Sequence, residues 1–174
     1  MATKVAKLGS DAMGKALTGF HDWRRSLRSP IAALAEEGLS IRVIEIIGYL
    51  VLAGTALGMR LWDLGSRALH HDESLHAYFS WFFYSTGKFE HNPLMHGPFL
   101  FEATAGLFRI LGGPSDYTSR VLAVIFGTVL VILPYFFRER LGRIGALLIS
   151  VMLVFSPAMF YYSRFIRNDI IMAV

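Results

Sequence analysis

The sequence predicts an all-α integral membrane protein, because of its composition, its apolar runs and the placement of its charges. Hydrophobic residues make up 54% of the 174 residues and charged residues only 17%, and the mean hydropathy is +0.47. This balance is typical of proteins embedded in a bilayer. The chain has no cysteine, which excludes a disulfide scaffold and a thiolate zinc site.

Three apolar runs are each long enough to cross the hydrocarbon core as a helix. We assign these transmembrane helices to residues 42–62, 119–137 and 144–163. The first contains a single acid, Glu45, near its start, and the second carries no charge after Arg120. Pro157 near the end of the third predicts a kink, since proline has no N–H for the helical hydrogen bond.

The loop between the first two spans, residues 63–118, is expected to hold helices that lie along the membrane surface. Aromatic residues are dense after Glu73, and that density is typical of the membrane–water interface. Residues 99–111 are apolar but only about half a span long, which fits an interfacial or re-entrant helix. Either Ser115 or Asp116 is expected to cap the helix that follows.

Lys and Arg residues set the expected orientation. They cluster before the first span and again in residues 138–143, so both segments are expected to be cytoplasmic in a plasma membrane protein. The loop 63–118 and residues 164–174, which end at the start of a further helix, then face outward. Residues 1–41 read as a basic amphipathic helix on the anionic leaflet. The membrane accounts for these basic residues, so we expect no nucleic-acid partner.

Two polar clusters would therefore share the outer face. The first runs from His70 to His76 and includes Asp72 and Glu73. On a helix, Asp72 and His76 are four residues apart and share a face, so they form a plausible catalytic pair of base and hydrogen-bonding neighbour. The alternative is that Asp72 merely caps the helix and the histidines lie in solvent.

The second cluster follows the third span. Arg164 and Arg167 are candidates to hold an anion such as a lipid phosphate, although snorkelling to the interface also explains Arg164. Asp169 is not explained in that way, because an acid gains nothing from entering an apolar run. A third candidate, His96, lies in a turn-rich loop, where a single histidine is more often plain surface than a ligand.

The order and sidedness of these features resemble the membrane-embedded GT-C glycosyltransferases. The resemblance is to the dolichyl-phosphate-mannose protein mannosyltransferase and aminoarabinose transferase group, particularly its prokaryotic flippase-associated, archaeal-glycosylation-like branch. It covers roughly residues 60–169. The motifs that carry it are Asp72-Glu73 soon after the first span, Ser119-Arg120 opening the second, and the stretch from Phe160 to Asp169, which looks like a second acidic site.

The resemblance implies transfer of a sugar from a polyprenyl-phosphate donor to an acceptor on the outer face. Asp72 would be the catalytic base, Glu73 its partner, and Asp169 the second acid. Arg164, Arg167 and Asp169 are the positions implied for substrate binding, and the residues themselves add His71, His76 and His96 as candidates. No cofactor is certain; some members of the group use a divalent metal, and a set of carboxylates and histidines would suit one.

The chain departs from this group in one respect, since its members continue through many more spans. We therefore expect either a fragment of a longer enzyme, inactive alone, or a piece that docks onto other membrane proteins. A second hypothesis is a non-catalytic subunit of a membrane complex, favoured by small residues on the first span (Gly48, Ala53, Gly54 and Gly58). A transporter or proton-relay fragment is disfavoured, because the spans hold almost no ionisable residues.

Overall fold

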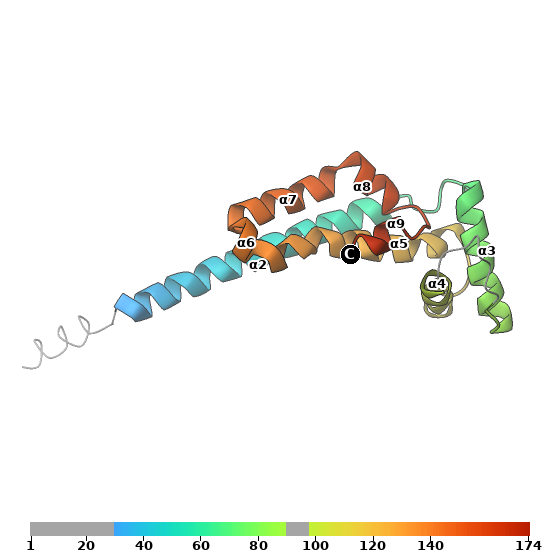
Figure 1. Ribbon diagram of the computed structural model, residues 1–174, viewed down its shortest axis with the longest axis horizontal. Helices are drawn as coiled ribbons and strands as arrows, with labels where there is room; N and C mark the ends of the chain where they lie inside the picture. Colours follow the sequence, from blue (N-terminus) through green and yellow to red (C-terminus); the bar gives the residue numbers. More distant parts are fainter. Residues whose placement is uncertain (1–29, 90–97) are drawn as a thin grey trace, which may run out of the picture. The chain divides into compact units, whose positions relative to one another are not determined.

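The computed structural model describes residues 30–89 and 98–174, with side chains described from residue 40 onward. All regular elements in these ranges are helices, as expected, and the described residues contain no strand (Figure 1). The chain divides into two units, residues 1–46 and 47–174, and every contact discussed below lies in the second. Residues 1–29 of the expected amphipathic segment 1–41 and the candidate His96 lie outside the described residues, and residues 30–41 of that segment belong to helix α2.

The first described helix, α2, runs from Pro30 to Leu61. Its second half carries exposed apolar side chains, among them Leu50 and Val51. Two helices in the described part of the chain are long and apolar enough to span a membrane: Ser40–Leu61 and Asp116–Leu141. These two helices indicate membrane association.

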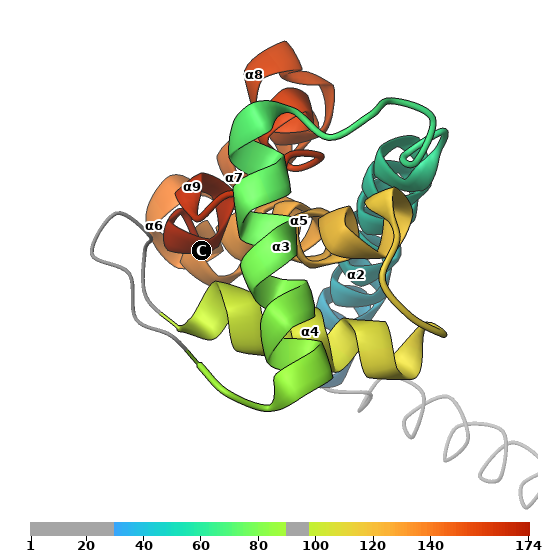
Figure 2. The ribbon, with the colours of Figure 1, turned by 90° about the vertical axis from the view of Figure 1, so that its right-hand side faces the viewer.

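The helices α3 (His71–Thr86) and α4 (Phe99–Ile110) follow and pack against each other, as Figure 2 shows. Helix α3 ends at Gly87, whose φ of 69° is a left-handed conformation that glycine adopts without strain. A core of Ala77, Leu100, Leu122 and Ile166 joins α3 and α4 to the beginning of α5.

Helix α5 covers Asp116–Ile132 and is capped by Ser115, one of the two expected caps, whose Oγ accepts from the Thr118 N–H. It passes into the 3-10 helix η1 (Leu133–Phe137), which contains Pro134 near its start. Proline removes one α-helical hydrogen bond, and the tighter turn follows from that loss. The short α6 (Arg138–Leu141) then carries Arg138 and Arg140 of the predicted cytoplasmic loop, and Arg143 begins the next helix.

The third expected span is broken where Pro157 predicted a kink. Helix α7 covers Arg143–Phe155, Ser156 is extended, and α8 covers Pro157–Tyr162. With 13 residues, α7 is shorter than a span, so a third crossing stays a prediction. The last helix, α9, covers Asp169–Met172 and packs against α5. It lies within residues 164–174, where the sequence predicts the start of a further helix.

Gly127 allows α5 to approach the end of α8 closely. A Cβ at this position would overlap the Cβ of Ser163 and would lie 3.2 Å from Nε of Arg60. We expect Gly127→Ala to lower the free energy of unfolding by about 1–3 kcal/mol, because a packed site has no room for the methyl group. Unfolding in detergent by a denaturant series measures this change.

Gly106 in α4 provides the matched control for that prediction. It is also a helical glycine, but an added Cβ there meets nothing within 4 Å. Gly106→Ala should therefore be neutral or stabilise the protein by up to about 1 kcal/mol through helix propensity. Equal effects of the two substitutions would show that α5 and α8 do not pack as described.

Candidate functional site

Two arginines hold the turn that follows α2. Arg164 donates from Nη2 to the carbonyl oxygens of Trp62 and Asp63, at 2.8 and 3.0 Å. Arg120 donates to three further carbonyls in the same turn, those of Leu64, Arg67 and Ala68. Asp63 has a φ of 53°, a left-handed conformation that is uncommon outside glycine. The arginines thus fix a backbone segment that has little regular structure of its own.

Glu73 and Arg120 form a buried ion pair at the beginning of α3 and α5. The guanidinium donates from Nε and Nη2 to the two carboxylate oxygens, both at 2.8 Å. The Glu73 side chain is fully buried and that of Arg120 is 2% exposed. The carboxylate also accepts from the backbone N–H groups of His70 and Ile166. One carboxylate therefore joins three segments of the chain.

Burial by itself raises the pKa of Glu73, but the surrounding donors reverse that effect. Hydrogen bonds from Arg120 and from the His70 and Ile166 N–H groups, together with the Arg120 charge, lower the pKa below its ordinary value. Glu73 is thus a well-satisfied anion inside the fold. Because it is fully buried and both of its oxygens already accept hydrogen bonds, its geometry suits a positioning role.

Asp72 and Asp169, from the two polar clusters of the sequence, meet through Arg167. The Arg167 guanidinium lies 3.7 Å from Oδ2 of Asp72 and 3.2 Å from Oδ2 of Asp169. The Asp72 side chain is 48% exposed and that of Asp169 is 50% exposed. Residues from the first turn of α3 and from the beginning of α9 therefore form one accessible group of charges.

The histidines take a different arrangement from the predicted catalytic pair. The Nδ1 atom of His76 lies 2.7 Å from the backbone oxygen of Asp72, not from its carboxylate, and the imidazole stacks on Phe101. The cap of α3 is His70, whose Nδ1 accepts from the Asp72 N–H, so Asp72 is not the capping residue. His71 is exposed at the helix start. His76 is buried and lies within the fold, not at an open surface.

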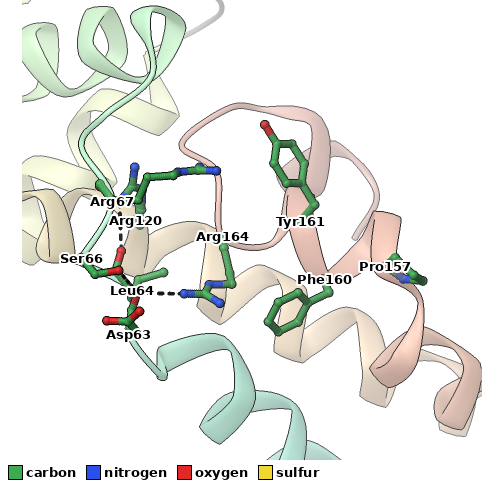
Figure 3. A pocket seen from close by; sticks show the side chains of 9 residues that line it. All are labelled: Asp63, Leu64, Ser66, Arg67, Arg120, Pro157, Phe160, Tyr161 and Arg164. Carbon is green, nitrogen blue, oxygen red and sulfur yellow. Dashed lines mark hydrogen bonds between the residues drawn. The ribbon is translucent and has the colours of Figure 1, made fainter.

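A cavity of about 430 Å³ opens between residues 63–67 and α8. Its polar wall holds Asp63, Arg67, Arg120 and Arg164, and its apolar wall holds Pro157, Phe160 and Tyr161 (Figure 3). The Arg67 guanidinium extends toward the Tyr161 ring, with Cζ 5.8 Å from its centroid. Arg164 lies over Phe160 at 5.1 Å.

No protein family, no curated protein and no solved structure matches the chain. Within the described residues, no group of three or more metal-ligating side chains has the arrangement of a metal site. The sequence did not single out Arg67, whose only signal is its place shortly before the His70–His76 cluster. The sequence indicated Arg120 only by its position at the start of the second span. It did not show that Arg120 pairs with Glu73.

Proposed function

We propose that this chain is the N-terminal module of a membrane glycosyltransferase that uses a polyprenyl-phosphate-linked sugar on the outer membrane face. One observation carries the proposal: the two acidic clusters that the sequence separates are joined by Arg167 into one accessible group. Glu73, the residue after Asp72, adds a buried carboxylate whose oxygens already accept hydrogen bonds. Accessible and buried carboxylates next to each other suit separate chemical and positioning roles.

The membrane setting in this proposal has three spans, with α3 and α4 along the outer interface. Exposed apolar residues recur on one side of α7, and a soluble surface would seldom tolerate that stripe: Ile144, Leu148, Met152 and Phe155. Helix α3 exposes Tyr78 and Trp81, residues that favour the headgroup region. Both observations support lipid contact along α7 and α3.

In the proposed reaction, Asp72 acts as the base. Its half-exposed carboxylate takes the proton of the acceptor hydroxyl while that oxygen bonds to the anomeric carbon of the donor sugar. The bond from that carbon to the phosphate oxygen breaks, and the polyprenyl phosphate leaves with the electron pair. Arg167 holds Asp72 near Asp169 and so orients the base.

We expect Asp72→Asn to reduce sugar transfer from a polyprenyl-phosphate donor by about 10²–10⁴-fold, because the amide cannot accept the proton. Transfer is measured in native membranes with a labelled donor sugar. Asp116→Asn is the matched control, since Asp116 is also an acid in the first turn of a helix, α5. Unchanged transfer in Asp72→Asn would remove Asp72 from the mechanism.

A second candidate function, a non-catalytic subunit of a membrane complex, is favoured by the open face of α2. At Gly48, Gly54 and Gly58 an added Cβ would meet nothing within 4 Å. Small residues on an uncovered span permit close packing by another helix. In this reading, the chain purifies in fixed stoichiometry with other membrane proteins, and Asp72→Asn changes no transfer reaction.

A further inference from the structure

We propose that the cavity between residues 63–67 and α8 is a phosphate-binding site, in which Arg67 and Arg164 hold the anion. The proposal rests on the proposed function, because it names the group by which a lipid-linked donor would be held. The sequence predicted Arg164 and Arg167 as the phosphate-binding arginines, and this proposal puts Arg67 in the place of Arg167. Arg167 lies between two carboxylates and does not line the cavity, whereas Arg67 does.

The hydrogen-bond donors around the cavity show which arginines are available to a ligand. Arg120 makes five hydrogen bonds to Glu73 and to the turn, which use every N–H of its guanidinium. Arg164 makes both of its bonds from Nη2, which leaves the donors on Nε and Nη1. Arg67 lies 3.7 Å from Glu73 and is 58% exposed. Arg67 and Arg164 therefore retain donors for an anion.

The charges near the cavity have a positive sum. Arg67, Arg120 and Arg164 face two carboxylates, Asp63 in the wall and Glu73 behind Arg120. Burial lowers the pKa of Arg164; the Asp63 charge opposes that shift, and the charges of Arg120 and Arg67 add to it. A bound anion would relieve this repulsion. Guanidinium groups bind phosphate oxygens in pairs, which favours phosphate as the ligand.

The other wall indicates what the phosphate carries. Pro157, Phe160 and Tyr161 form an apolar surface opposite the arginines, and the space exceeds that of a bare inorganic ion. Ligand sites combine such apolar walls with a few placed polar groups. The geometry therefore fits a phosphate ester whose substituent lies along α8.

The test uses the full protein in nanodiscs of phosphatidylcholine doped with a polyprenyl monophosphate, with undoped discs as the reference. We expect Arg67→Gln to weaken binding of the phosphate lipid by about tenfold, a typical loss for one charge-assisted contact. Asp63→Asn should tighten binding severalfold, because it removes the opposing carboxylate. Asparagine also tolerates the left-handed conformation at this position. The exposed Arg140 provides the control, Arg140→Gln, with unchanged binding.

Arg67→Gln should lower the affinity for the phosphate lipid and Asp63→Asn should raise it. These opposite changes distinguish a charge effect from misfolding, because misfolding would weaken binding in both variants. A second arm adds inorganic phosphate: competition indicates recognition of phosphate itself, and its absence indicates that the lipid-linked ester is required. Either result supports the site if Arg67→Gln weakens binding. Equal binding by wild type, Arg67→Gln and Arg164→Gln would overturn it. Normal phosphate binding together with unchanged sugar transfer by Asp72→Asn in native membranes would overturn the glycosyltransferase mechanism and leave this site standing.

Discussion

Glu73→Gln should lower the free energy of unfolding by about 3–5 kcal/mol, the cost of breaking a buried ion pair by removing one charge. Glutamine has the same shape, but it replaces one acceptor oxygen with an NH₂ donor. That donor would face Arg120 or the N–H groups of His70 and Ile166. The Arg120 charge would then lie inside the fold with carbonyl oxygens as its main remaining partners.

The effect of Glu73 on stability should depend on pH with a defined sign. Its pKa is lower in the folded protein than in the unfolded chain, where it is about 4.3. The stabilisation is therefore fully present above the unfolded pKa and is lost as the pH falls through the folded value. Unfolding measured between about pH 7 and pH 3 should show wild type losing stability in acid. Glu73→Gln should lose less over the same interval.

The neighbouring residue supplies the control for Glu73. Asp72 is half exposed and pairs only at 3.7 Å with Arg167, so Asp72→Asn should change the free energy of unfolding by no more than about 0.5 kcal/mol. This contrast also separates the two acids by role. If Glu73→Gln unfolded like wild type, the ion pair with Arg120 would not be part of the native fold.

The apolar helices and the break at Pro157 were predictable because they depend on local features, whereas the change to a 3-10 helix at Leu133–Phe137 was not predicted. Apolar length identified the segments that became α2 and α5, and Pro157 identified the break between α7 and α8. The approach of Asp72 and Asp169 followed from a global rule, the sidedness of basic residues. It required no knowledge of which side chains touch.

The partners of individual side chains were not predictable from sequence. Asp72 and Glu73 are adjacent and chemically alike, yet one is half exposed and the other fully buried. The difference arises because Arg120, distant in the chain, faces only one of them. Helical spacing predicted that Asp72 and His76 share a face, and it brings the imidazole to the Asp72 backbone oxygen. The pairing of His76 with the Asp72 carboxylate stays a prediction. Spacing fixes which residues are neighbours but not which atoms meet.

Arg60 connects α2 to the break between α7 and α8, and its loss should have the second large effect. The residue is 1% exposed, and its guanidinium donates to Oγ of Ser163 and to the backbone oxygens of Ala56 and Leu153. The Leu153 oxygen would normally accept from the residue four positions later. That residue is Pro157, which has no N–H. Arg60 therefore supplies the donor that the proline lacks.

We expect Arg60→Ala to lower the free energy of unfolding by about 3–5 kcal/mol, through the cavity it leaves and the unpaired Leu153 carbonyl. In the proposed membrane setting, where α7 is the third span, no water replaces the lost donor, which increases the cost. Arg140→Ala, at an exposed arginine in α6, is the matched control and should be close to neutral. Both variants are compared by denaturant unfolding in detergent.

The double variant tests the cause directly. In Arg60→Ala, the further change Pro157→Ala supplies an N–H for the Leu153 oxygen and should recover about 1–3 kcal/mol. In the presence of Arg60, the same change should recover nothing, because the carbonyl already has a donor at 3.2 Å. In the double-mutant cycle of Arg60→Ala and Pro157→Ala, the coupling energy should thus be about as large as one buried hydrogen bond. Additive effects of the two changes would show that Arg60 does not compensate for the proline.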